Sequence, residues 1–125
     1  MKKTIATEDA PKAIGPYSQA IEVNSMVFCS GQLGIDPAAG ELEGDLNQQT
    51  RRILTNIQAV LKASGCGMND VIKATVFLTD MKDFAEFNAI YGEFFTAPYP
   101  ARSTVQVAAL PKNARLEIEV IAVKP

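Results

Sequence analysis

Two charged side chains stand among apolar residues near the end of the chain. The stretch PARSTVQVAALPKNARLEIEVIAV holds two segments in which side chains alternate as they do in β-strands. Arg102 opens the first segment, on the same face as Thr104, and its planar guanidinium can bind a carboxylate through two parallel hydrogen bonds. Glu117 and Glu119 share a face of the second segment with Ile121, where a carboxylate either pairs with a cation or has a raised proton affinity. Taken singly, each charge also fits a structural role on a solvated strand face.

Two other stretches could present groups to a ligand. In AIGPYSQAI, the Gly15-Pro16 turn presents Tyr17 where the chain enters a strand. In FCSGQLG, Gly31 and Gly34 allow the backbone N–H groups to approach a ligand closely. Both stretches are also ordinary turn sequences. GQLG is not a phosphate-binding loop, because it lacks the lysine and the strand-to-helix setting.

Composition excludes several classes of protein. The 125 residues fit one domain, 1–125, and contain no histidine, which removes the commonest general base and metal ligand and excludes zinc chemistry and a Ser-His-Asp triad. The net charge is −2 and lysines and arginines do not cluster, so nucleic-acid binding is not expected. No apolar run reaches the roughly 20 residues that a membrane helix needs. The N-terminal MKKTIATEDAPKA lacks an apolar export segment, so we expect a cytoplasmic protein with Cys29 and Cys66 as free thiols.

The pattern of apolar residues predicts an α+β domain with two helices. A helix is expected over 45–64, capped by Asp45 with Gln48 in a capping box, and a second over 83–95, ended by TAPYP. Strands are expected at 3–6, 18–23, 26–31, 71–79, 101–108 and 115–123. This order predicts a two-layer sandwich in which both helices cover one face of a mixed β-sheet. The segment from strand 26–31 through the first helix to strand 71–79 should be a right-handed crossover.

The face of the sheet away from the helices is predicted to need cover. In VIKATVFL, the set Ile72, Ala74, Val76 and Leu78 alternates with the set Val71, Lys73, Thr75 and Phe77, and the second set is only half polar. Ile121 and Val123 add apolar side chains to the same outer face. No further helix is available in the chain, so another subunit is the economical cover.

Taken together, these motifs resemble those of one family. AIGPYSQAI, FCSGQLG, DVIKATVFLTDMKDFAEFNAIYGEFF and PARSTVQVAALPKNARLEIEVIAV occur in this order, cover nearly the whole chain and closely resemble the RidA (YjgF) family of reactive-imine deaminases. The resemblance implies a chorismate-mutase-like fold, a homotrimer with ligand clefts at the subunit boundaries, and hydrolysis of 2-iminobutanoate or 2-iminopropanoate to the 2-keto acid and ammonia.

The same resemblance assigns roles to individual residues. The carboxylate-binding arginine falls on Arg102 and the site glutamate on Glu117, which orients or deprotonates a water; this chemistry needs neither a metal nor a cofactor. The ligand-binding positions fall on Tyr17, Gly31, Asn88, Arg102 and Thr104. Thr104 departs from the family pattern, since many members read PARSCVEV with a cysteine there. Alternative readings are a non-catalytic trimer that binds 2-keto acids or amino acids, an endoribonuclease and, least favoured, a chorismate mutase.

Overall fold

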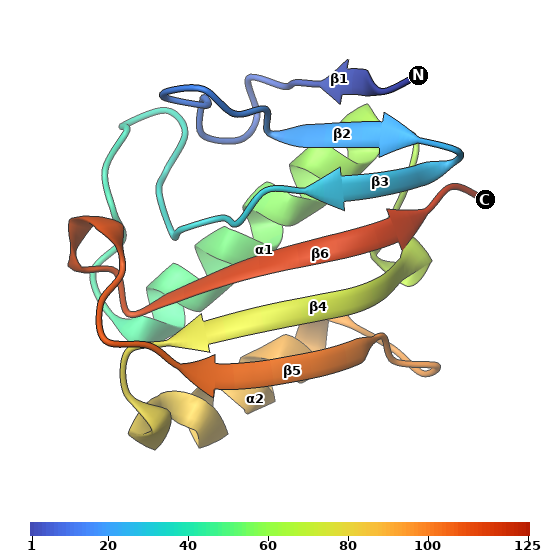
Figure 1. Ribbon diagram of the computed structural model, residues 1–125. Helices are drawn as coiled ribbons and strands as arrows, with labels where there is room; N and C mark the ends of the chain where they lie inside the picture. Colours follow the sequence, from blue (N-terminus) through green and yellow to red (C-terminus); the bar gives the residue numbers. More distant parts are fainter.

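The computed structural model describes residues 1–125, which form one six-stranded sheet covered by two helices (Figure 1). The strands lie in the order β1-β2-β3-β6-β4-β5, and β4 and β5 are the parallel pair while the other neighbours are antiparallel. Their bounds are β1 Lys3–Ile5, β2 Ala20–Val23, β3 Met26–Cys29, β4 Val71–Leu78, β5 Ala101–Gln106 and β6 Leu116–Val123. The prediction of a mixed sheet is confirmed.

Helix α1, Leu46–Ala63, forms where the sequence predicts it. Asp45 accepts a hydrogen bond from the backbone of Gln48, and the Gln48 side chain accepts one from the backbone of Asp45, so the expected capping box is present. Ser64 caps the C-terminal end of the helix, and Gly65 follows with a φ of 84°. Its apolar side packs against the sheet and fixes α1 as the main cover of the core.

Helix α2, Phe84–Phe94, is extended at its start by a 3₁₀ turn, Met81–Asp83. The Asp80 side chain caps this turn by accepting from the backbone of Lys82, while Asp83 instead forms an ion pair with Arg115. Asp80 therefore caps the start of this helical segment, and Asp83 does not. After the helix the chain passes through TAPYP and enters β5 at the edge of the sheet.

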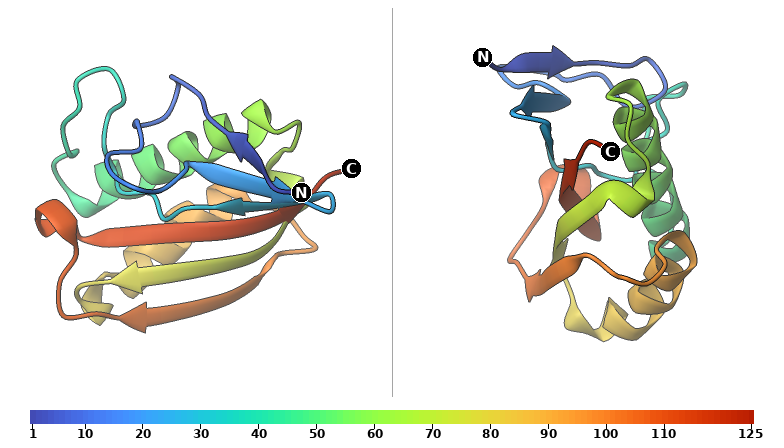
Figure 2. Two further views of the ribbon diagram at one scale, coloured as in Figure 1. Left: turned by 45° about the horizontal axis from the view of Figure 1, so that its top comes forward. Right: turned by 90° about the vertical axis from the view of Figure 1, so that its right-hand side faces the viewer.

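Both helices lie on one face of the sheet, as the right-hand view of Figure 2 shows. The predicted two-layer arrangement is confirmed. Strands β3 and β4 are both antiparallel to β6, which lies between them, so the connection through α1 joins two parallel strands that are not neighbours. No helix is long and apolar enough to cross a membrane.

One predicted strand face is wrong at its start. The pairing of β4 with β6 slips between Val71 and Lys73, which is a β-bulge, and the bulge turns Val71 into the core and Ile72 to the outer face. Val71 is 5% exposed and Ile72 is 46% exposed. From Ala74 onward the predicted alternation holds. Val71 therefore needs no outside cover, and Ile72 takes its place on the outer face.

The two cysteines are buried and free, as predicted. Burial raises the pKa of the Cys29 thiol to about 12, and Cys66 adds to the rise. A thiol with so high a pKa is almost entirely protonated at neutral pH and is a poor nucleophile. Cys29 therefore acts as a small core residue, and Cys66 is buried in the same core.

Candidate active site

A cleft of about 970 Å³ lies where β3 ends and the chain leaves the sheet. Three of the predicted site residues, Tyr17, Gly31 and Glu117, line it. The connection from β1 to β2, the loop after β3 and the turn before β6 gather at this end of the sheet, on the left of Figure 1. They contribute the other lining residues, among them Lys12, Gln32, Asp36 and Lys112. Segments that are far apart in the sequence thus form one candidate site.

Glu117 lies on the outer face of β6, opposite Phe77 of β4, and is half-buried. Burial raises the pKa of its carboxyl group above the ordinary value, and the neighbouring Glu119 adds to the rise by like-charge repulsion. A carboxylate with a raised pKa accepts a proton more readily than a solvated one. Glu117 is therefore suited to take a proton from a water molecule.

Gly31 is packed directly against this carboxylate. A Cβ atom built on Gly31 would lie 2.6 Å from Oε2 of Glu117, so any side chain at position 31 would force the end of the Glu117 side chain to move. Residue Gln32, the next in the chain, holds the segment to β6 by two backbone hydrogen bonds with Ile118. The absence of a side chain at position 31 thus leaves the Glu117 carboxylate in place.

Replacing Gly31 with alanine should inactivate the site without unfolding the protein. The new methyl group must displace the end of the Glu117 side chain, which is flexible, so we expect a loss in kcat/KM of at least about tenfold with a melting temperature near that of the wild type. Steady-state kinetics and thermal unfolding on the same sample check this. Gly67→Ala is the matched control, because nothing lies within 4 Å of a Cβ built there. An active Gly31→Ala enzyme would contradict the placement of Glu117.

Tyr17 stands at the rim of the cleft, in the turn predicted from GPY. Its backbone N–H donates to the carbonyl of Gly15 at 2.9 Å, and its hydroxyl oxygen accepts from the N–H of Ile14 at 3.3 Å. The ring is 52% exposed. The turn therefore presents the aromatic side chain toward whatever occupies or covers the cleft.

Gln19, which no pattern in the sequence indicates, holds one wall of the cleft. This buried side chain accepts from the N–H of Thr7 at 2.7 Å and donates to the carbonyl of Pro11 at 2.7 Å. A glutamine whose amide bonds two points of a loop fixes that loop better than apolar packing alone. The signal in the sequence is weak, since a glutamine just before a strand reads as an ordinary polar residue.

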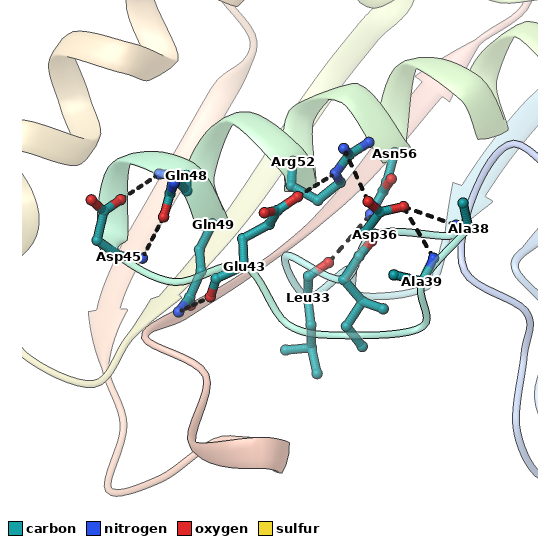
Figure 3. Close-up of polar contacts among 11 residues, drawn as sticks. Leu33, Asp36, Ala38, Ala39, Glu43, Asp45, Gln48, Gln49, Arg52 and Asn56 are labelled. Atoms are coloured by element: carbon teal, nitrogen blue, oxygen red, sulfur yellow. Dashed lines mark hydrogen bonds and ion pairs between the residues drawn. The ribbon is translucent and has the colours of Figure 1, made fainter.

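Helix α1 holds the opposite wall, the loop between β3 and α1 (Figure 3). The buried Asn56 donates to the carbonyl of Ile35 at 3.0 Å, and Arg52 bonds Glu43 at 3.1 Å. Gly34 lies against the backbone of Gln49, where a Cβ atom would be only 2.7 Å from Cα. The close approach that Gly34 permits is therefore to the helix and not to a ligand, which corrects the prediction for this glycine.

Arg102 is not in the cleft of the same chain. On β5 it is paired in register with Ala74 of β4, a fully buried residue on the helix side, and its guanidinium lies over aromatic rings of α2. Glu117 lies on the outer face of the sheet. The two charges that the sequence analysis singled out thus lie on opposite faces, and they do not meet within one chain.

Thr104 and Asn88 belong with Arg102. Thr104 is two residues along β5 on the same face as Arg102, and its Oγ1 atom is buried without a hydrogen-bond partner. Asn88 is exposed on α2. It lies four residues after Phe84 and three before Tyr91, so the three side chains share one side of the helix. The predicted site residues therefore form two groups, one in the cleft and one at the β5 edge beside α2.

The pH dependence of activity should report the raised pKa of Glu117, which is due first to burial and then to repulsion from Glu119. Only the ionised Glu117 can accept a proton, so kcat/KM should fall on the acid side at a pH above the ordinary carboxyl value. Glu119→Gln removes the neighbouring charge and should shift this acid limb to lower pH. Glu86→Gln, an exposed position on α2, is the control and should leave the limb unchanged. An acid limb that does not move in Glu119→Gln would show that Glu117 does not control it.

The comparisons with known proteins agree with this fold. The model of the Endoribonuclease L-PSP family matches residues 7–124. A RutC family protein from Pyrococcus horikoshii is 54% identical over 125 residues, covering 99% of each chain, and the 2-iminobutanoate/2-iminopropanoate deaminase of Salmonella typhimurium is 50% identical, again over 99% of each. The crystal structure of E. coli TdcF with bound serine superposes with a TM-score of 0.95 at 50% identity, covering 98% of this chain and 99% of that one. The chain belongs to the Endoribonuclease L-PSP family, which is the RidA (YjgF) family that its motifs resemble.

Proposed function

We propose that this protein hydrolyses 2-iminobutanoate and 2-iminopropanoate to 2-keto acids and ammonia. The observation that carries the proposal is the half-buried Glu117, held against Gly31 in a cleft of sufficient volume for a small acid. Relatives with about 50% identity over the full length bear the name of this activity. The histidine-free sequence suits a reaction in which a carboxylate is the only base that is needed.

A site that contains both Glu117 and Arg102 requires a second copy of the chain. The outer face of the sheet carries four exposed apolar side chains that a second copy would cover: Phe28, Ile72, Val105 and Val123. When the outer faces of neighbouring subunits pack together, the β5 edge of one copy can close the cleft of the next. We therefore propose a chorismate-mutase-like homotrimer with three equivalent sites at its subunit boundaries, as a closed ring of identical contacts requires.

Each residue then has a defined part in the reaction. Arg102 from one subunit binds the substrate carboxylate with two parallel hydrogen bonds and so fixes the imine carbon near the neighbour's Glu117. Glu117 takes a proton from a water, whose oxygen adds to the carbon of the protonated imine. Glu117 then gives the proton to the nitrogen, the C–N bond breaks, and ammonia leaves as the hydroxyl loses its proton to Glu117. Tyr17, Asn88 and Thr104 line the space in which the reaction occurs.

The experiment that tests this function is an imine-trapping assay. A threonine dehydratase generates 2-iminobutanoate, semicarbazide traps it, and the amount of adduct is followed with and without this protein. We expect the protein to lower adduct formation in proportion to its concentration. Unchanged adduct formation would sink the proposed activity.

A second candidate function is binding of amino acids or 2-keto acids without turnover. It is favoured by the relative TdcF, whose crystal structure contains bound serine. The same cleft and the same arginine would serve both functions, so binding does not separate them. The separating observation is the trapping assay: a protein that binds 2-ketobutanoate yet leaves adduct formation unchanged would be a binding protein.

The trimer predicts a particle of about 40 kDa in solution, three times the 13.5 kDa of one chain. Light scattering at dilute concentration measures this mass. Ile121, between Phe28 and Lys73 on the outer face, is a suitable site for disruption, and Ile121→Asp should reduce the mass by burying a charge in the contact. Thr55→Asp, exposed on α1 on the other side of the molecule, should leave the mass unchanged. A wild-type monomer would end the proposal of a shared site.

We also propose that the protein acts in the cytoplasm, without a metal or cofactor. Two buried free thiols suit a reducing compartment. The protonated imine is already electrophilic, so water addition needs a base and not a Lewis acid. Activity should therefore persist after dialysis against a chelator.

A further inference from the structure

The hydroxyl group of Tyr91 is buried without a hydrogen-bond partner. Tyr91 lies on the inner side of α2 and is 5% exposed, and its hydroxyl oxygen forms no hydrogen bond of good geometry. Buried polar atoms in folded proteins are nearly always hydrogen-bonded, since each one left without a partner costs stability. Phenylalanine would fill the same volume without that cost. The hydroxyl therefore calls for an explanation other than packing.

The ring of Tyr91 is held rigidly by its neighbours. Its centroid is 5.5 Å from that of Phe87 and 4.4 Å from that of Phe95, and both of those rings are buried. Such contacts fix the orientation of an aromatic side chain. The face that they leave open points to the β5 edge.

Arg102 lies on that open face. Its guanidinium carbon is 4.7 Å from the Tyr91 centroid, closer than to Phe84 at 5.7 Å or Phe87 at 5.6 Å. A cation at this distance over an aromatic ring is attracted by it. Ala74, the residue paired with Arg102 on the neighbouring strand β4, is small and buried, which leaves room for the guanidinium beside α2.

The hydroxyl and the guanidinium also influence each other. Burial raises the pKa of the Tyr91 hydroxyl, and the charge of Arg102 opposes this rise. The Arg102 guanidinium also comes into hydrogen-bonding range of the oxygen, which opposes the rise further, but it does not have the geometry of a hydrogen bond. Lone pairs on the oxygen are therefore available beside a group that carries five N–H donors. A carboxylate bound in the forked geometry uses only two of the five donors, and the others need acceptors.

We propose that Tyr91 is a positioning residue for Arg102. Its ring fixes the plane of the guanidinium, and its hydroxyl accepts a hydrogen bond from the N–H that faces away from the substrate carboxylate once that carboxylate is bound. This inference rests on the proposed function of Arg102 as the carboxylate-binding group. It gives the buried hydroxyl a partner in the working state of the site.

The test is Tyr91→Phe, which removes the hydroxyl and keeps the ring. We expect the Kd for 2-ketobutanoate and the KM for the imine to rise about tenfold, as for loss of a hydrogen bond to a charged group, with kcat changed much less. The melting temperature should be equal to or above that of the wild type, because an unpartnered buried hydroxyl is removed. Tyr99→Phe, which removes an exposed hydroxyl, is the control and should leave all these values unchanged.

A double-mutant cycle identifies the residue through which Tyr91 acts. In an Arg102→Lys background, Tyr91→Phe should change the Kd for 2-ketobutanoate, measured by NMR titration, by less than about twofold. An effect of equal size in both backgrounds would overturn the inference, and so would a wild-type Kd in the single Tyr91→Phe variant. Arg102→Lys alone separates the two proposals: normal activity in that variant contradicts the proposed function, whereas a silent Tyr91→Phe contradicts only the role of Tyr91.

Discussion

Replacing Arg102 with lysine is expected to remove most of the imine hydrolysis although the positive charge is kept. Lysine offers no planar fork, so it cannot form two parallel bonds to a carboxylate, and it loses the flat contact with the rings of α2. A hydrogen bond to a charged group contributes about 1.5–3 kcal/mol, so losing one or both should reduce kcat/KM by about tenfold to several thousandfold. Steady-state kinetics in the trapping assay measures the loss.

Stability distinguishes this role from a structural one. Arg102 has no carboxylate partner within its own chain, so a purely structural account has no ion pair to lose. Arg51→Lys is the matched control, because Arg51 forms an exposed ion pair with Glu93 and should tolerate the change with full activity. Near-normal hydrolysis by Arg102→Lys would end the case for carboxylate binding. A fall in activity that only follows a fall in folded protein would do the same.

Replacing Glu117 with glutamine should abolish turnover while leaving 2-ketobutanoate binding nearly intact. The amide keeps the shape of the side chain but cannot accept the proton from water, and general-base catalysis contributes roughly 10²- to 10⁴-fold. The Kd should stay near the wild-type value, because Arg102 and not Glu117 is the proposed carboxylate-binding group. Calorimetric titration with 2-ketobutanoate and the trapping assay on one sample make the comparison.

The same variant has a stability signature. The folded-state pKa of Glu117 is raised above the unfolded value, so its contribution to stability is present below the unfolded pKa and is lost as the pH rises through the folded pKa. At neutral pH the Glu117→Gln protein should therefore melt at the same temperature as the wild type or higher. A lower melting temperature with retained hydrolysis would make Glu117 a structural residue.

The arrangement of helices and strands could be predicted well from local patterns. The capping box of Asp45 and Gln48 and the apolar stripe of α1 placed that helix to within a residue at each end. Three strands are shorter than the sequence predicts: 18–23, 26–31 and 101–108 are observed as Ala20–Val23, Met26–Cys29 and Ala101–Gln106. The alternation of side chains continues beyond the residues that pair in the sheet. The bulge at Val71 could not be foreseen, since it depends on pairing with Ile121 and Ala122 of β6, which are distant in the sequence.

The site could be predicted as a set of residues but not as an arrangement. The side chains of Arg102 and Glu117 indicate carboxylate binding and proton transfer, and the family motifs indicate the other site residues, Tyr17, Gly31, Asn88 and Thr104. Which face of the sheet each occupies depends on the register between strands and on which face the helices cover. Gln19 and Asn56 escaped notice because a polar side chain that anchors a loop has no sequence signature of its own.

The description Endoribonuclease L-PSP raises the alternative of RNA cleavage, and the cleft argues against it. Glu117, Glu119 and Asp36 line it together with only two lysines, Lys12 and Lys112. Carboxylates repel a phosphate backbone, whose binding requires clustered cations. A small acid that is held by an arginine from the adjoining subunit fits these charges better.

Subunit complementation tests the central claim, that Arg102 and Glu117 of different subunits form each site. The Arg102→Lys and Glu117→Gln proteins, each expected to have strongly reduced activity alone, are unfolded together, refolded as mixtures and assayed for imine hydrolysis. In a mixed trimer one site of three combines an intact Arg102 with an intact Glu117, so a random equal mixture should regain about a quarter of the wild-type activity. If both residues act within one chain, every site in the mixture carries a substitution and mixing restores no activity. A mixture that is no more active than its components would therefore contradict the account.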